Sequence, residues 1–324
     1  MNAALQTVLR RQSMLRSALG SEIGDALVDP LVVEIMVNPD GALRFDKLGE
    51  GCRDSGVRLE ATQVERIVRL VASMTHGEVH AERPIISAEL PSAGERFEGL
   101  LPPVTPAPCF AIRKPASRIY GLDDYVRDRL LTPDLADLLR DCVARRLNIL
   151  IAGGTSSGKT TLANALLAEL AATDERVILI EDTRELQCAA PDTVALRTRL
   201  PHVSMSDLVR STLRLRPDRI IVGEVRGPEA LDMLKAWNTG HPGGIATVHA
   251  NSASAALSRI EQLVQEAVVN VPRRLIAEAI DLVVFIAGRG LDRRIETVAA
   301  LTGVEPDGEY FLAAFPSPST SKGE

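Results

Sequence analysis

The feature that most constrains this chain is a glycine-rich stretch at residues 153–160, with the sequence GGTSSGKT. A mostly apolar run at residues 148–152 comes directly before it, and a segment rich in helix-forming residues follows it. A strand, a loop of the pattern G-x-x-x-x-G-K-T and a helix, in this order, are typical of the phosphate-binding P-loop. We therefore expect phosphate binding here, the alternative being a glycine-rich turn that binds nothing.

The residue types of this stretch suit phosphate chemistry. Its glycines let the backbone turn tightly and bring N–H groups against an anion, toward which the next helix directs its positive end. Lys159 would neutralise β- and γ-phosphate oxygens, and the Thr160 hydroxyl would complete the coordination of Mg²⁺. The residues expected to hold the ligand are Gly153, Gly154, Thr155, Ser156, Ser157, Gly158, Lys159, Thr160 and Thr161.

The composition is that of a soluble globular protein, and 324 residues are enough for about two domains. A formal net charge of −6 argues against a broad surface for polyanions, so no specific nucleic-acid site is expected. The four cysteines form no C-x-x-C pair, which fits a reducing cytosol. No apolar run is long enough to span a membrane, and residues 1–20 suggest an amphipathic helix rather than a secretion signal. We expect a cytoplasmic protein whose membrane contacts are peripheral.

The N-terminal part predicts a small α+β domain over residues 1–118. Residues 31–46 indicate a strand, a turn and a strand, because Pro and Gly lie between two apolar runs. Residues 61–75 have apolar side chains at helical spacing. Further short strands are expected at residues 84–90, 96–101 and 109–113. The polar segment that follows, residues 119–130, is expected to be a linker.

The C-terminal part, residues 131–324, predicts an α/β domain. Thr132 can cap a first helix, after which strands and helices alternate. The strands are expected at residues 148–152, 176–181, 219–223, 245–249 and 281–287. They are apolar throughout, which indicates a largely parallel sheet buried on both faces, with its ligands beyond the carboxyl ends of the strands. A disordered tail is expected from about residue 317.

Three of these strand ends carry residues with useful chemistry. Carboxylates cluster at residues 181–185, although solvated loop residues or helix caps would give the same pattern. An apolar strand delivers Glu224 to the place of a Walker B acid, where Asp is the commoner residue. Another strand ends at His249, which could contact a phosphate or a carboxylate, although a lone histidine is more often structural. We expect these side chains to converge on Lys159.

Four motifs in this order resemble those of the secretion ATPases of type II and type IV systems. They are a Walker A loop at 153–160, an acidic box at 181–185, a Walker B strand ending at Glu224 and a histidine box at 240–249. Residues 94–103 and 109–115 are similar to segments of the conjugative-transfer branch of that family. The resemblance covers the chain up to about residue 305.

This resemblance implies a RecA-like P-loop NTPase core, a PAS-like N-terminal domain and a homo-hexameric ring that hydrolyses ATP with Mg²⁺. In such a ring Glu224 would orient the attacking water, Glu185 would lie near the metal, and His249 would sense the γ-phosphate. Arg96 and Arg113 would approach the phosphates from the N-terminal domain. Five arginines around the Walker B strand are too many for one phosphate group, and most of them would be solvated or lie between subunits: Arg210, Arg214, Arg216, Arg219 and Arg226.

The expected function is to power conjugative pilus assembly and type IV secretion from the cytoplasmic side of the inner membrane, where the ring would dock on membrane components. The alternatives are a pilus-retraction motor, a DNA-translocating motor or helicase, a P-loop kinase, and a nucleotide-switched scaffold with negligible hydrolysis. Stimulation by DNA would indicate a helicase or DNA-translocating motor, and transfer of phosphate to an acceptor would indicate a kinase. Function without hydrolysis would indicate a scaffold.

Overall fold

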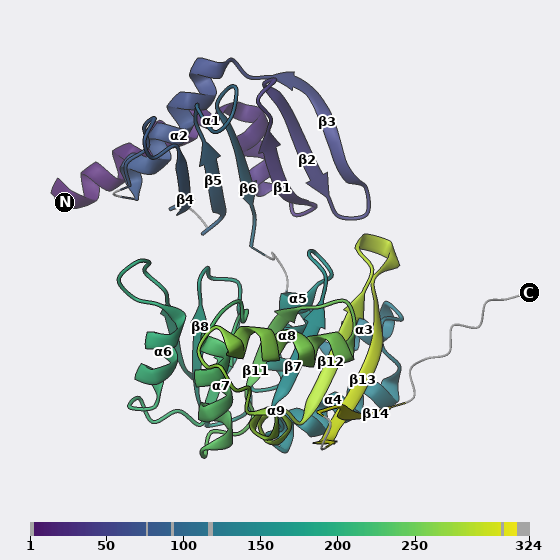
Figure 1. Cartoon of the computed structure of the whole chain (residues 1–324). Helices are drawn as coiled ribbons and strands as arrows, with labels where there is room; N and C mark the ends of the chain where they lie inside the picture. Colours follow the sequence, from purple (N-terminus) through teal and green to yellow (C-terminus); the bar gives the residue numbers. More distant parts are fainter. Residues whose placement is uncertain (1–2, 76, 92–93, 116–118, 306–307, 316–324) are drawn as a thin grey trace, which may run out of the picture. The chain divides into compact units, whose positions relative to one another are not determined.

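The chain forms two compact units, Met1–Ser117 and Arg118–Glu324, in a computed structural model (Figure 1). The structure describes residues 3–75, 77–91, 94–115, 119–305 and 308–315. The expected disordered tail from about residue 317 lies outside them.

The N-terminal unit consists of helices packed on one antiparallel sheet. Its elements are α1 (Ala3–Val28), β1 (Val32–Val37), β2 (Ala42–Lys47), β3 (Gly51–Arg58), α2 (Ala61–Met74), β4 (Ile85–Glu89), β5 (Arg96–Leu100) and β6 (Cys109–Arg113). The strand order is β3-β2-β1-β6-β5-β4, and every neighbouring pair is antiparallel. Apolar residues at helical spacing in α2, such as Ile67 and Val71, pack with Phe97 and Ile112 of the strands. The α+β prediction for this part of the chain therefore matches its elements.

Two features of this unit differ from the sequence-based expectation. The N-terminal helix continues past residue 20 to Val28, and Gly20 interrupts it with a φ of 77°. Strand β3 was not expected, because it contains no apolar run and its side chains are almost all exposed at the edge of the sheet. Pairing with β2, rather than burial, holds this strand in place.

The C-terminal unit is a three-layer α/β structure. Its helices are α3 (Leu122–Arg127), α4 (Pro133–Ala144), α5 (Lys159–Ala168), α6 (Met205–Thr212), α7 (Glu229–Asn238), α8 (Ala253–Gln265), α9 (Arg273–Ala279) and the 3-10 turn η1 (Gly290–Asp292). Its strands are β7 (Ile149–Gly153), β8 (Arg176–Glu181), β9 (Asp192–Arg197), β10 (Arg219–Val222), β11 (Ile245–His249), β12 (Leu282–Ala287), β13 (Arg294–Val304) and β14 (Tyr310–Ala314).

The eight strands of this unit form one sheet in the order β14-β13-β12-β7-β11-β10-β8-β9. The pairs from β12 to β9 are parallel, and only the β12–β13 and β13–β14 pairs are antiparallel. Successive residues of β7 face opposite sides: Ile149 and Ile151 pack toward α3, α4 and α5, whereas Leu150 packs toward α6, α7, α8 and α9. The α/β prediction and the buried parallel strands are thus confirmed.

The structure corrects two expectations for this unit. The segment 119–130, expected to be a linker, contains α3, and its Leu122 and Tyr125 are buried in the core beside α4 and α5. Arg219, expected to be solvated or between subunits, is 1% exposed. It donates to Glu175, Val143 and Gly243, which satisfy its guanidinium inside the unit.

Candidate functional site

The glycine-rich loop lies at the carboxyl edge of the C-terminal sheet, between the end of β7 and the start of α5 (Figure 1). Gly158 has a φ of 97°, and a side chain there would be strained. A Cβ on Gly153 would lie 2.6 Å from the carbonyl oxygen of Ile286 on β12, so only glycine fits between the two strands. Both glycines therefore fix the path by which the backbone turns into α5.

Lys159 and Ser157 give this loop its polar groups. Lys159 is 7% exposed, and its Nζ donates to the carbonyl oxygens of Gly153 (3.1 Å) and Gly154 (2.9 Å). Ser157 is buried, and its Oγ has no hydrogen-bond partner among the described residues. A buried hydroxyl without a partner is costly unless a ligand completes it, so the loop fits an anion such as phosphate.

A line of side chains leads from the loop to the neighbouring strands β11 and β10. Lys159 Nζ lies 3.5 Å from Nδ1 of His249, whose Nε2 lies 2.9 Å from Oε1 of Glu224. The other oxygen of Glu224 accepts from Arg226, which also lies 3.8 Å from Asp182. The structure therefore brings Glu224 and His249 to Lys159, as the positions of the strand ends predicted.

The charges around His249 fix its protonation state. Burial lowers the pKa of His249, and the neighbouring Lys159 cation lowers it further against the opposing effect of Glu224. The imidazole is consequently neutral at pH 7. With Nδ1 facing the Lys159 ammonium, which can only donate, the ring proton belongs on Nε2, toward Glu224.

The acidic box joins the loop from β8. Glu185 Oε2 accepts from Thr160 Oγ1 at 3.2 Å. Glu181, at the end of β8, is buried and accepts from the backbone N–H groups of Glu185 (2.9 Å) and Leu186 (2.7 Å). Burial raises the pKa of Glu181, while these N–H groups act in the opposite direction. Glu181 therefore shapes the turn that presents Glu185 to Thr160.

The Thr160–Glu185 pair is suited to Mg²⁺, which prefers oxygen ligands and retains several waters. Among the described residues there is no cluster of three or more histidine, cysteine or acidic side chains that could hold a metal alone. One hydroxyl with a carboxylate beside it fits a metal whose other ligands would be phosphate oxygens and water.

Sequence reasoning missed one residue that organises this site. Asn164 of α5 donates to the carbonyl oxygen of Glu185 and accepts from the N–H of Gln187, which pins the acidic box to the loop helix. Ser157 and Arg226 add the unpartnered hydroxyl and the cation beside Glu224. Both had a sequence signal: Ser157 belongs to the expected phosphate-binding loop, and Arg226, expected to be solvated or between subunits, has a side chain that is 52% exposed and also contacts Glu224.

Arg96 and Arg113 belong to the N-terminal unit, on β5 and β6. They are directly opposite each other in the antiparallel register. Both alternate with Phe97 and Ile112 of the core, so they project from the sheet face opposite the helices. Their approach to a nucleotide stays a prediction.

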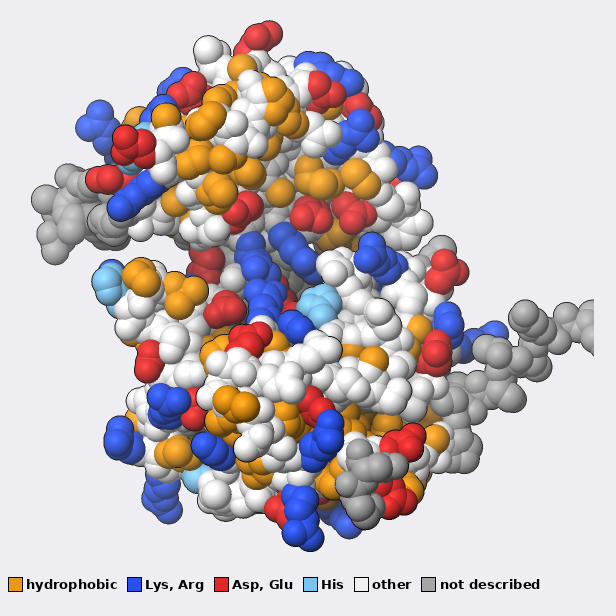
Figure 2. All heavy atoms as spheres, viewed as in Figure 1, with side chains coloured by type: hydrophobic (Ala, Val, Ile, Leu, Met, Phe, Trp, Pro, Cys, Tyr) orange, Lys and Arg blue, Asp and Glu red, His pale blue; other side chains and the backbone are white. Residues whose placement is uncertain are grey.

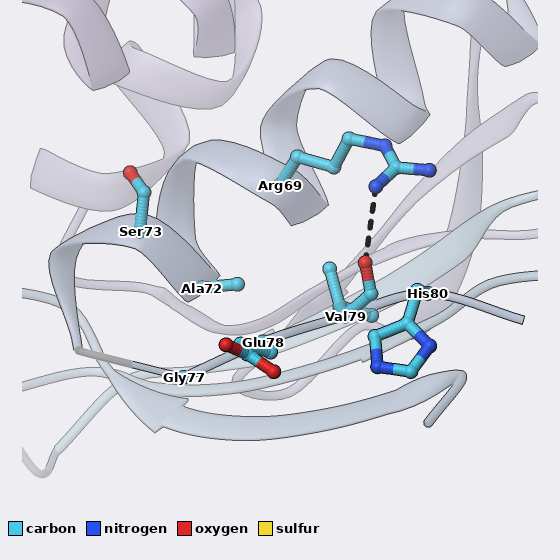
Figure 3. A pocket seen from close by; sticks show the side chains of 7 residues that line it. All are labelled: Arg69, Ala72, Ser73, Gly77, Glu78, Val79 and His80. Carbon is cyan, nitrogen blue, oxygen red and sulfur yellow. Dashed lines mark hydrogen bonds between the residues drawn. The ribbon is translucent and has the colours of Figure 1, made fainter. Parts of the chain in front are cut away.

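A pocket of about 310 Å³ lies in the N-terminal unit, beside the end of α2 (Figure 3). Arg69 closes one side by donating to the carbonyl oxygen of Val79 at 3.0 Å, and His80 accepts from the N–H of Glu82.

The surface is mixed in charge, with basic and acidic side chains interspersed over the viewed face of the C-terminal unit (Figure 2). No helix within the described residues is both long and apolar enough to cross a membrane.

Comparison with known proteins connects this site to secretion. Residues 26–294 match the family model described as type II/IV secretion system protein. The conjugal transfer protein TrbB of Rhizobium radiobacter is 50% identical over 291 residues, which cover 89% of this chain and 90% of the relative. The type IV secretion system protein VirB11 of Bartonella henselae is 35% identical over 248 residues, covering 64% of this chain and 69% of the relative.

Solved structures show the same fold. The pilus retraction motor PilT with bound ADP has a TM-score of 0.59 at 20% identity, covering 93% of this chain and 83% of that one. The ATPase DotB of Legionella pneumophila has a TM-score of 0.58 at 19% identity, covering 89% and 77%.

Proposed function

Because the chain belongs to the type II/IV secretion system protein family, we propose that it is a Mg²⁺-dependent ATPase with a RecA-like core that powers conjugal transfer through a type IV secretion system. The observation that carries this proposal is the line of contacts from Lys159 through His249 to Glu224 beside the glycine-rich loop. Phosphoryl transfer depends mainly on positioning and charge stabilisation, and these residues supply both.

The loop would bind the triphosphate through its N–H groups, the positive end of α5 and two side chains. Lys159 would exchange its carbonyl partners, Gly153 and Gly154, for phosphate oxygens, which are stronger acceptors for an ammonium. Ser157 Oγ would gain the partner that it lacks. Binding thus satisfies a buried hydroxyl and places a cation beside the β- and γ-phosphates.

Glu224 would orient the attacking water. Its Oε2 accepts from the Arg226 guanidinium, and its Oε1 lies 2.9 Å from His249 Nε2, so the carboxylate is placed between these two side chains. Since Nδ1 of His249 faces Lys159, a change in the position of Lys159 on loss of the γ-phosphate would reach Glu224 through one imidazole ring. This arrangement supports the sensor role expected for His249.

Thr160 and Glu185 would hold Mg²⁺ against the phosphates. The ion would neutralise charge that develops on the phosphate oxygens. Thr160 would supply its hydroxyl to the ion, and Glu185, held in place through Asn164 and Glu181, would supply a carboxylate beside it.

We further propose that the working form is a homo-hexamer in which Arg96 and Arg113 reach a nucleotide. Two like charges directly opposite on neighbouring strands are unfavourable without an anion between them or nearby acids. Glu34 lies opposite Arg113 on the other side, and Glu89 lies opposite Arg96, so the row holds two acidic and two basic side chains. The two adjacent arginines at the centre of the row are the groups that would contact a phosphate, and docking on inner-membrane components would make the ring a peripheral motor.

The test is phosphate release from ATP by the purified protein. Lys159→Ala should lower turnover by at least about 100-fold, because a buried charge contact to the phosphates is lost. Lys235→Ala, which removes an exposed lysine of α7, is the matched control and should leave turnover unchanged. Turnover that survived Lys159→Ala would contradict the assigned site.

A further inference from the structure

Arg293 approaches the glycine-rich loop from the side opposite to Glu224. It follows η1 and precedes β13, whose Arg294 pairs with Ala287 at the carboxyl end of β12. Strand β12 in turn pairs with β7, where Ile286 lies opposite Gly153. The register therefore places Arg293 at the same sheet edge as the loop.

The Arg293 guanidinium lies flat against Gly158. A Cβ on Gly158 would be 2.9 Å from Cζ, 3.0 Å from Nε and 3.1 Å from Nη1. A point almost equally distant from three atoms of a planar group lies over its face, so one face of the guanidinium rests on the loop. Gly158 is needed here for this close approach as well as for its positive φ.

Arg293 lacks the partners that a structural arginine would have. Its Nε is buried and has no hydrogen-bond partner within the described residues, and the same holds for the hydroxyl of Tyr125 on α3. Tyr125 is 1% exposed, and burial raises the pKa of its phenol while the Arg293 charge opposes the rise. The Tyr125 hydroxyl therefore stays protonated near the Arg293 cation. The Tyr120 ring packs edge-on against the Tyr125 ring, with 6.5 Å between the ring centroids.

The orientation of the nucleotide follows from the strand order. His249, Glu224 and Glu185 come from β11, β10 and the end of β8, all on one side of β7. These residues mark the end of the loop where the γ-phosphate and metal would lie. The base and ribose must then point to the other side, where β12 and β13 bring Arg293.

We propose that Arg293 binds the purine base of the nucleotide, stacking one face of its guanidinium on the base while the other rests on Gly158. This inference rests on the proposed nucleotide site. A planar guanidinium stacks on aromatic rings, and Arg is therefore suited to a base as Lys is not.

Titration calorimetry with two probes separates the base from the phosphates. ATP carries a base, and inorganic tripolyphosphate does not, so both are titrated in the presence of Mg²⁺. Arg293→Ala should weaken ATP binding about 10-fold and leave tripolyphosphate binding unchanged. Arg293→Lys, which keeps the charge and loses the plane, should also weaken ATP selectively. Arg294→Ala is the matched control, because this exposed neighbour pairs with Glu296 at 2.7 Å.

The outcomes are distinct. Equal weakening of both probes would assign Arg293 to the phosphates and overturn the proposal, as would ATP affinity that Arg293→Ala and Arg293→Lys leave unchanged. If Arg293→Ala does not fold, as shown by its thermal transition, Arg293→Lys alone decides between these results. Failure of the unaltered protein to bind either probe would instead contradict the proposed nucleotide site itself.

Discussion

The two edges of the C-terminal sheet both carry charged side chains, but they hold them differently. At the amino edge, Arg219 is 1% exposed and donates to Glu175 and to two backbone carbonyls. At the carboxyl edge, His249 and Arg226 are about half exposed, and Lys159 donates to two carbonyls of its own loop and lies 3.5 Å from His249. A buried charged group whose hydrogen bonds are all made within the protein holds strands together. A charged group near the surface that can exchange its partners is available to a ligand.

The amino edge is further closed by Asn148. Its side chain donates to the carbonyl oxygen of Ala279 and accepts from the N–H of Gly244, and its own N–H donates to Asp281. These bonds join the segments that lead into β7, β11 and β12. We therefore expect substitutions at the amino edge to lower the free energy of unfolding, and substitutions at the carboxyl edge to lower ATP turnover.

The largest expected effect on stability is that of Glu175→Ala. It would leave Arg219 buried without its carboxylate, which costs about 3 to 5 kcal/mol of unfolding free energy. Burial opposes the ionised form of Glu175, but Arg219 and Arg146 hold its pKa below the usual value. Urea unfolding measures the loss, and Asp141→Ala, which removes an exposed partner of Arg145, is the control. If Glu175→Ala lowered the free energy of unfolding no more than Asp141→Ala does, the stabilising role of the amino edge would be contradicted.

A smaller effect is expected for Glu185→Gln at the carboxyl edge. Turnover should fall about 10-fold and the Mg²⁺ concentration for half-maximal turnover should rise, because a carboxylate near the metal becomes a neutral amide. The amide oxygen still accepts from Thr160, so the thermal transition should not move. The measurement is ATP turnover over a Mg²⁺ series, and an unchanged requirement for Mg²⁺ would separate Glu185 from the metal.

The smallest effect is that of pH on His249. Because its pKa is lowered in the folded protein, the unfolded chain binds the proton more tightly, and stability falls as pH drops below about 6.5. The side chain is 43% exposed, so screening by water limits the loss to less than about 1 kcal/mol. Urea unfolding of the protein and of His249→Gln at pH 7.5 and 5.5 isolates this contribution. An equal pH dependence in both would show that His249 titrates as in the unfolded chain.

The features of the fold that follow local rules were predicted from the sequence. Strands β7, β8, β10, β11 and β12 are continuous apolar runs, and the glycine-rich loop and Thr132 have patterns that fix their local geometry. The convergence of Glu224 and His249 on Lys159 followed from one rule, that parallel strands bring their carboxyl ends to one edge.

The features that depend on distant partners were not predictable in this way. Arg219 is polar in sequence, and its burial depends on Glu175, 44 residues away. Strands β13 and β14 were not expected, and pairing with β12 and with each other places them at the edge of the sheet. Helix α3 follows Gly121 in a segment whose polar residues indicated a linker. Its burial comes from packing in the core beside α4 and α5.

The most direct test of the central claim is to measure ATP binding and phosphate release on the same preparation of Glu224→Gln. The amide keeps the shape of the side chain and loses the charge that directs water, so binding should persist while turnover falls by about 100-fold or more. Its thermal transition should stay within about 1 °C of the unaltered protein, since about 1 kcal/mol shifts that transition by several degrees. Full turnover by Glu224→Gln would contradict the assignment of hydrolysis to the carboxyl edge.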